Sequence, residues 1–172
     1  VEVRTFGEQA VDGDALAVRG FRFAQGEAGD TPARLLPALQ ALRVSTGFAA
    51  RPIDADLVHC HTWYAHFGGL LARILYGLPL VVTAHSLEPL RPWKREQLGR
   101  GADLAAWIEK TTLEAADRVV AVSGEMRQDI LDHFAVAPER VAVIGNGIDT
   151  DEYRPDPARD RLARFGFDAD RP

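Results

Sequence analysis

The chain has 172 residues, of which 47% are hydrophobic and 26% are charged, as in an ordinary globular protein. Its 20 Lys and Arg residues against 25 Asp and Glu residues give a net charge of −5, which argues against nucleic acid as a partner. The single cysteine, Cys60, excludes an internal disulfide and a cysteine-rich zinc site. No apolar run is long enough to cross a membrane, and the first residues lack a signal-peptide pattern, so we expect a cytoplasmic protein without membrane insertion.

Short apolar segments alternate with longer helical patterns along the chain. The pattern predicts, in order, a strand at 1–6, a turn at 7–14, a strand at 17–23, a loop at 25–32 and a helix from Thr31-Pro32 through Val44. It continues with a strand at 56–61, a helix at 67–76, a strand at 80–84, a polar loop at 85–101 and a helix at 103–116. The last elements are a strand at 118–122, a helix at 124–134 with Ser123 as N-cap, a strand at 141–144, a turn at 145–149 and a short helix at 159–165.

Near-continuous apolar strands between helices are typical of a parallel sheet that is covered on both faces. Right-handed crossovers then give an α/β domain with a doubly wound parallel sheet. Ligands of such sheets bind beyond the carboxyl ends of the strands. We therefore place the candidate site in the four segments that follow strands, which are 59–64, 85–94, 123–127 and 145–149.

The densest group of reactive side chains follows the strand at 80–84. Residues 85–94 contain a His, a Glu, an Arg, a Trp and a Lys, with two prolines that stiffen the segment. Arg91 and Lys94 are suited to clamp a phosphate, Trp93 offers an apolar face to a sugar ring, and Glu88 accepts hydrogen bonds from sugar hydroxyls. This mixture favours a phosphorylated sugar as ligand, and the alternative is an exposed charged loop.

The other strand ends are less specific. His59 and His61 lie two residues apart on a strand and point to one face, which suggests a metal pair and, as an alternative function, a metal-dependent hydrolase. Ser123 opens a helix whose backbone amides are able to bind an anion, and Arg127 follows one turn later. Neither a dinucleotide-binding glycine motif nor a P-loop is present in the sequence.

Four motifs together carry a resemblance to a known family: residues 59–64 (HCHTWY), 81–94 (VVTAHSLEPLRPWK), 114–123 (EAADRVVAVS) and 145–149 (GNGID). The chain resembles the N-terminal domain of a retaining GT-B glycosyltransferase of family 4, within the actinobacterial glycogen synthase branch that includes α-maltose-1-phosphate synthases. The resemblance implies a Rossmann-like, acceptor-side domain at 1–150, whose opening strand would precede Val1. Residues 151–172 would form the crossing segment to a C-terminal nucleotide-sugar-binding domain in cis.

The same resemblance implies an activity. The intact enzyme would transfer glucose from ADP-glucose, with retention, and form an α-1,4 linkage on α-glucose 1-phosphate or on glycogen. It would need no metal and no other cofactor, and this chain would be inactive alone. A non-catalytic sugar-phosphate-binding module is a further alternative, and a homodimer stays open as an assembly.

The resemblance also assigns roles to residues. His85 matches the histidine that lies beside the donor glucose at the reaction centre, and it would orient the donor and stabilise the transition state. The loop on the acceptor side would be His61, Thr62, Trp63 and Tyr64, and chemistry adds Glu88, Arg91 and Lys94 to the acceptor pocket. Further substrate contacts are expected from Ser123, Arg127 and Asn146. Thr62 stands where many relatives carry Asp.

Overall fold

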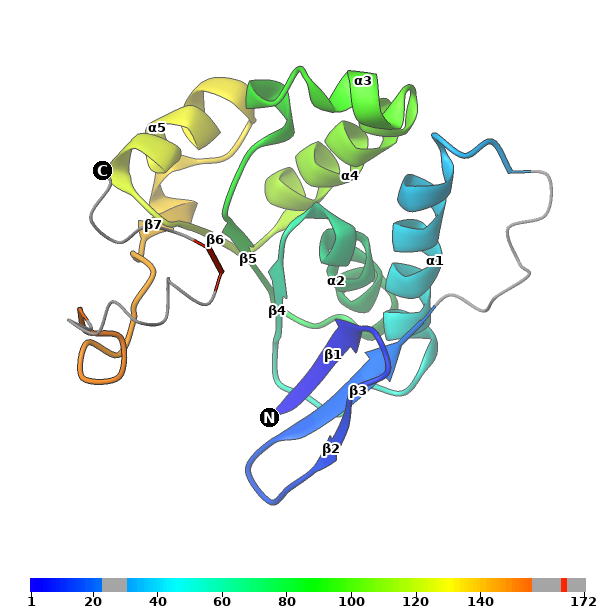
Figure 1. The fold of residues 1–172 in the computed structure, drawn as a ribbon, viewed down its shortest axis with the longest axis vertical. Helices are drawn as coiled ribbons and strands as arrows, with labels where there is room; N and C mark the ends of the chain where they lie inside the picture. The colour runs from blue at the N-terminus through cyan, green and yellow to red at the C-terminus, as the bar shows by residue number, and fades with distance from the viewer. Residues whose placement is uncertain (23–30, 156–164, 167–172) are drawn as a thin grey trace.

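The computed structural model describes residues 1–22, 31–155 and 165–166 (Figure 1). Its strands are β1 (Glu2–Phe6), β2 (Ala10–Asp12), β3 (Ala17–Phe21), β4 (Val58–His61), β5 (Leu80–Ala84), β6 (Arg118–Ala121) and β7 (Val141–Val143). Its α-helices are α1 (Leu36–Ala50), α2 (Trp63–Tyr76), α3 (Lys94–Leu98), α4 (Gly101–Ala115) and α5 (Gly124–His133). Two short 3₁₀ helices are η1 (Glu88–Leu90) and η2 (Pro138–Arg140).

The main sheet is parallel and has the strand order β4-β5-β6-β7. Its central strands are apolar on both faces, as the sequence predicted: Leu80 and Val82 of β5 and Val119 and Ala121 of β6 have no exposed surface. These residues belong to one hydrophobic core, which also includes Leu113 of α4 and Ile130 of α5. The predicted α/β fold with a parallel sheet is therefore confirmed.

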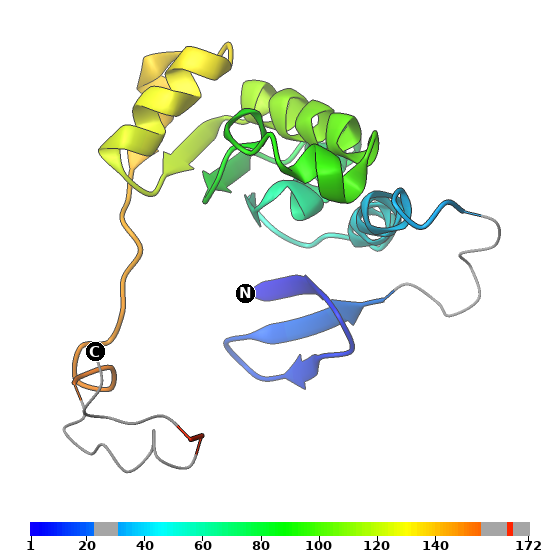
Figure 2. The same cartoon turned by 45° about the horizontal axis from the view of Figure 1, so that its top comes forward.

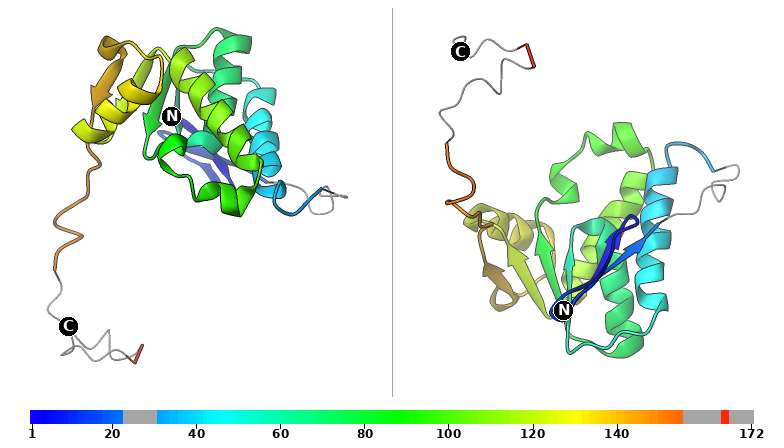
Figure 3. Two further views of the ribbon diagram at one scale, coloured as in Figure 1. Left: turned by 90° about the horizontal axis from the view of Figure 1, so that it is seen from above. Right: turned by 60° about the horizontal axis from the view of Figure 1, so that its bottom comes forward.

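Helices α1, α2 and α4 pack side by side, and α2 lies closest to β4 (Figure 3). Two glycines of α2 make this approach possible. A Cβ atom at Gly69 would overlap Cys60 Sγ and lie 2.9 Å from Leu80 Cδ1, and one at Gly68 would lie 2.8 Å from the Ser45 carbonyl oxygen. The glycine pair therefore sets the distance of α2 from both β4 and α1.

The first strands form a second, smaller sheet that lies apart from the main sheet (Figure 2). Its order is β1-β3-β2, with β1 parallel and β2 antiparallel to β3. The prediction of a simple turn at 7–14 is wrong over Ala10–Asp12, which form β2. Three residues are too few for a periodic signal, and β2 exists only through its pairing with β3.

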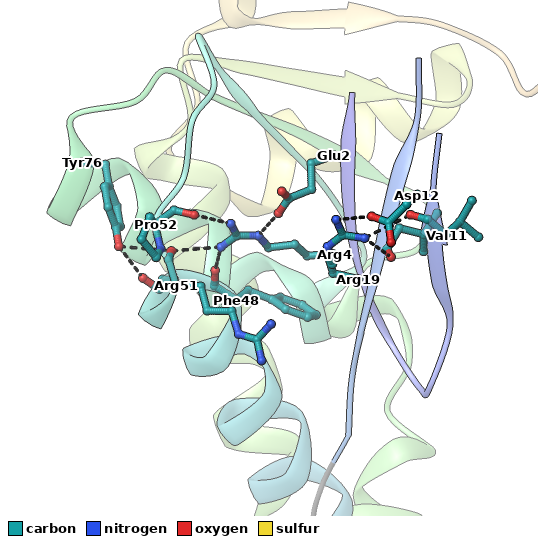
Figure 4. A network of polar contacts seen from close by, with 11 residues as sticks. Glu2, Arg4, Val11, Asp12, Arg19, Phe48, Arg51, Pro52 and Tyr76 are labelled. Carbon is teal, nitrogen blue, oxygen red and sulfur yellow. Dashed lines mark hydrogen bonds and ion pairs between the residues drawn. The ribbon is translucent and has the colours of Figure 1, made fainter. Parts of the chain in front are cut away.

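Arg4 ties the small sheet to the end of α1 (Figure 4). Its guanidinium group donates hydrogen bonds to the carbonyl oxygens of Phe48, Arg51 (3.1 Å) and Pro52 (2.5 Å), and it pairs with the Glu2 carboxylate. The last carbonyl groups of a helix have no partner within the helix, so a cation at this position satisfies them and complements the helix dipole. One side chain thus joins β1 to the C-terminal end of α1.

Several element boundaries differ from the prediction. Helix α2 begins at Trp63 rather than Phe67, α1 begins at Leu36 rather than at Thr31-Pro32, and α4 begins at Gly101. The predicted loop at 85–101 contains η1 and α3. Aromatic and β-branched residues have modest helix propensity, so tertiary packing decides these ends.

The chain beyond β7 has no further sheet strand in its described part. Residues 144–155 lead away from the domain, as the predicted turn at 145–149 implied (Figure 2). The predicted helix at 159–165 and the loop at 25–32 fall mostly outside the described residues. Within the described residues, no helix is long and apolar enough to cross a membrane.

Replacement of Gly69 by Ala tests the close contact between α2 and β4. The added methyl group overlaps Cys60 Sγ in a fully packed region, so we expect a loss of about 1–3 kcal/mol in the free energy of unfolding. Urea denaturation measures this loss. Gly124→Ala is the matched control, because nothing lies within 4 Å of a Cβ atom there, and it should be neutral or stabilising by less than about 1 kcal/mol. Equal stabilities of the two variants would contradict the packing argument.

Candidate functional site

A pocket of about 940 Å³ lies between the two sheets. Strand β1 is the edge of the small sheet and β4 is the edge of the main sheet, and residues of both strands line the pocket. Within the described residues, no strand pairs with these two edges on the pocket side. The lining also includes Tyr64 from the start of α2 and His85 from the end of β5. The pocket therefore reaches the carboxyl ends of β4 and β5, where the sequence places the site.

Two of the predicted site residues meet at this edge. The Nδ1 atom of His61 lies 3.1 Å from the Nε2 atom of His85, and the two rings stack with centroids 5.4 Å apart. The contact follows from the sheet, because His61 is paired with Thr83 in the register of β4 and β5 and His85 follows two residues later. The histidine expected at the reaction centre and the histidine expected on the acceptor side are thus in direct contact.

His59 extends this pair into a row of three rings. Its ring centroid lies 4.4 Å from that of His61, so the prediction that both point to one face is confirmed. Its Nε2 atom lies 2.7 Å from the Thr83 hydroxyl oxygen. Burial, followed by the charges of the neighbouring histidines, lowers the pKa of His59 and of His61. The uncharged form of both rings is therefore favoured, and they act as hydrogen-bonding groups.

The histidine row has no carboxylate or thiolate that would complete a metal site. In the part of the chain that the structure describes, no group of three or more His, Cys, Asp or Glu side chains is placed to hold a metal ion. Cys60, which lies between the two histidines, points to the buried side, and burial raises the pKa of its thiol to about 12. The geometry gives the hydrolase alternative no support.

A strained bend connects β4 to α2. Thr62 has φ +66° and ψ 154°, a region that a β-branched residue rarely adopts and that costs about 1–3 kcal/mol. The bend starts α2 immediately, so Trp63 and Tyr64 lie in its first turn, with ring centroids 5.9 Å apart. The sequence pattern did not predict this bend, because it places the start of the helix at Phe67. Strain of this kind is concentrated at functional sites.

His66, on the buried face of the same helix, was also missed. It is 1% exposed and lies close to the Thr83 backbone, but neither ring nitrogen makes a hydrogen bond of good geometry among the described residues. Burial, helped by the charge of His61, lowers its pKa from 6.5 to about 3. The first turn of α2 therefore holds a neutral imidazole on its buried face.

The segment at 85–94 is folded in on itself rather than extended into solvent. The Lys94 ammonium group pairs with the Glu88 carboxylate, and both side chains are largely buried. The Lys94 Nζ atom also lies 5.7 Å from the centre of the Trp63 ring, so this segment contacts the first turn of α2. Arg91 donates a hydrogen bond of 3.1 Å to the Ser86 hydroxyl group and has no ion pair among the described residues. Arg91 is thus the cation of this segment that is available to an anionic ligand.

The remaining predicted site residues follow β6 and β7, at the same edge of the sheet. Ser123 accepts a hydrogen bond of 3.0 Å from the Met126 N–H, so its predicted N-cap role is confirmed. Arg127 donates to the Pro138 carbonyl oxygen at 3.3 Å, and Asn146 lies exposed after β7. No contact joins these residues to the histidine row within the described chain, and their predicted contacts with substrate stay predictions.

Comparison with known proteins decides the family. Residues 1–152 match the model of Glycosyltransferase Family 4. The chain belongs to this family. It is 53% identical over 122 residues to the α-maltose-1-phosphate synthase of Mycolicibacterium smegmatis. This match covers 69% of this chain and 32% of that protein. It is 49% identical over 139 residues to the enzyme of the same name from Mycobacterium tuberculosis H37Rv. This match covers 78% of this chain and 36% of that protein.

The fold is that of the GT-B glycosyltransferases. The sucrose-phosphate synthase of Thermosynechococcus elongatus superposes with a TM-score of 0.66 at 17% sequence identity, over 99% of this chain and 43% of that one. Identity this low shows the fold alone. This family 4 chain spans about a third of the length of the curated relatives it matches.

Replacement of His66 by Leu tests the neutral buried imidazole. Because its pKa is lower in the folded than in the unfolded state, the unfolded state binds the proton more readily, so the protein loses stability as the pH falls from 6.5 towards 3. Between pH 7 and pH 5 the loss amounts to about 2 kcal/mol. Urea denaturation at both pH values should show a smaller decrease for His66→Leu than for the wild type. Equal decreases would show that the ring is not buried in its neutral form.

Proposed function

We propose that this chain is the acceptor-side domain of a glycosyltransferase that transfers glucose from ADP-glucose, with retention of configuration. The acceptor is α-glucose 1-phosphate or glycogen, and the new linkage is α-1,4. The observation that carries the proposal is the contact between His61 and His85 at the carboxyl edge of a parallel sheet, beside a segment that contains Arg91. The two mycobacterial relatives are α-maltose-1-phosphate synthases, which supports a sugar phosphate as acceptor. The domain that binds the nucleotide follows in cis.

In the proposed reaction the bond between C1 of glucose and the diphosphate breaks. The 4-hydroxyl oxygen of the acceptor bonds to C1 on the same face, and its proton passes to the leaving diphosphate. His85 hydrogen-bonds the donor glucose and stabilises the positive charge that develops on the sugar ring. His61 holds the His85 ring through their contact of 3.1 Å. Glu88 is not the nucleophile, because it is buried and paired with Lys94.

The acceptor lies on the other side of His61, against the first turn of α2. Trp63 and Tyr64 offer aromatic faces to a sugar ring, and the Lys94 ammonium group fixes Trp63 from behind. Arg91 carries the charge that a phosphate on the acceptor needs, since the charge of Lys94 is already balanced by Glu88. Thus Arg91 ranks above Lys94 as the phosphate contact.

Replacement of His85 by Ala in the two-domain enzyme removes the group that faces the donor. We expect kcat to fall by about 100-fold or more, because the lost interaction is made mainly in the transition state. Initial rates with labelled ADP-glucose measure the effect. His133→Ala, an exposed histidine on α5, is the control and should leave kcat within about twofold. A decrease of less than about threefold for His85→Ala would remove His85 from the reaction centre.

The acceptor is identified by offering α-glucose 1-phosphate and glycogen in parallel, with ADP-glucose and UDP-glucose as donors. Arg91→Ala should raise the KM for glucose 1-phosphate by about tenfold or more, because a charge-assisted hydrogen bond to phosphate is lost, and should leave the KM for glycogen unchanged. Arg95→Ala is the control, since Arg95 is exposed and paired with Asp103. Transfer to glycogen alone would reject the phosphate role of Arg91. Absence of transfer from either donor would favour a sugar-phosphate-binding module.

A further inference from the structure

A buried carboxylate on α4 has no part in the proposed chemistry. Glu109 is 2% exposed and lies in the same apolar stripe as Ala105, Ile108 and Leu113. Burial raises its pKa to about 7, although the hydrogen bond from the Glu88 N–H works in the opposite direction. Among the described residues, no Lys or Arg forms an ion pair with it. A carboxylate in such a place is costly to bury, so its contacts deserve an explanation.

The carboxylate of Glu109 is hydrogen-bonded to the segment at 85–94. The Oε2 atom of Glu109 accepts a hydrogen bond of 2.7 Å from the backbone N–H of Glu88. Glu88 is the first residue of η1, and the preceding residue, Leu87, provides no side-chain cap. The first N–H groups of a helix have no partner within the helix, so an acceptor from another element is needed there. Glu109 supplies the missing cap from 21 residues away.

Contacts lead from the capped residue to the first turn of α2, which follows directly after the strand end that carries His61. The Glu88 side chain pairs with Lys94, and the Lys94 ammonium group lies against the Trp63 ring. Trp63 follows Thr62 directly, and His61 contacts His85. The hydrogen bond to Glu109 fixes the Glu88 backbone from α4, and the Glu88 carboxylate pairs with Lys94 from that position.

We propose that Glu109 is a positioning residue that caps η1 and thereby holds the 85–94 segment against the first turn of α2. The effect on catalysis rests on the proposed function, whereas the effect on the segment does not. Glu109 contacts no substrate. It acts through Glu88, Lys94 and Trp63 on the acceptor side of the site, so its loss should weaken acceptor binding more than donor binding.

Two variants separate the hydrogen bond from the mere presence of a side chain. Glu109→Gln keeps the size and an acceptor oxygen for the Glu88 N–H, whereas Glu109→Met keeps a similar volume and removes the acceptor. Thr112→Val is the matched control, because Thr112 lies one turn further along α4, is fully buried, and bonds only its own helix at Ile108 (2.7 Å). All variants are compared in the protein that contains this chain, at equal fractions folded.

Hydrogen–deuterium exchange is the first measurement, since it does not depend on activity. We expect Glu109→Met to raise the exchange rate of backbone amides in 85–98 by about tenfold or more, while Glu109→Gln and Thr112→Val change it by less than about threefold. The backbone amides of β6 should exchange at the same rate in the three variants and in the wild type. Unchanged exchange at 85–98 in Glu109→Met, or an equal rise in Glu109→Gln, would overturn the proposal.

Steady-state kinetics is the second measurement. Glu109→Met should raise the acceptor KM by about tenfold and leave the donor KM within about twofold, and Glu109→Gln should restore most of the acceptor affinity. Equal losses for donor and acceptor would reject the positioning role. If the wild-type enzyme transfers no glucose from any donor, the proposed function fails, and exchange alone decides the role of Glu109.

Discussion

The site depends on the register between β4 and β5. Parallel pairing of His61 with Thr83 makes the two strands end at the same level, and His85 then lies within 3.1 Å of His61. A shift of the pairing by one residue would turn His59 and His61 to the buried face and place Cys60 at the site. The apolar face fixes the register, because Cys60 packs below the sheet in the core that also holds Leu80 and Val82. Core packing thus determines which side chains reach the pocket.

Helix α2 turns this sheet edge into a pocket. Because Gly68 and Gly69 carry no side chain, the helix approaches β4 closely enough for its first turn to stand beside the histidine row. The cost of that approach appears at Thr62, whose backbone takes a conformation that suits glycine better. The ring of His66, buried in the first turn of the same helix, makes no hydrogen bond of good geometry among the described residues. Unfavourable features therefore gather at one helix end, next to the proposed acceptor position, and stable packing elsewhere maintains them.

The sequence predicted what depends on local pattern. The apolar runs of β5 and β6, the shared face of His59 and His61, and the Ser123 cap each follow from a period or a residue type and are present in the structure. The pairing that creates β2 and the folding of 85–101 into η1 and α3 depend on contacts between distant residues, which no local period reports. The sequence pattern does show that Glu109 is a charged residue within the apolar stripe of α4. Its partner, a backbone N–H, has no signature in the sequence.

The distribution of charge separates two tasks within the site. Near the proposed reaction centre, burial lowers the pKa of His59 and of His61, which favours the uncharged form of these two rings, and uncharged imidazoles orient a sugar without trapping an anion. On the acceptor side, Lys94 is balanced by Glu88, so its charge serves the structure rather than a ligand. Arg91, in the same segment, forms no ion pair among the described residues. A sugar that carries a phosphate away from its reacting hydroxyl suits this arrangement, because its uncharged part meets the histidines while its charged part meets Arg91.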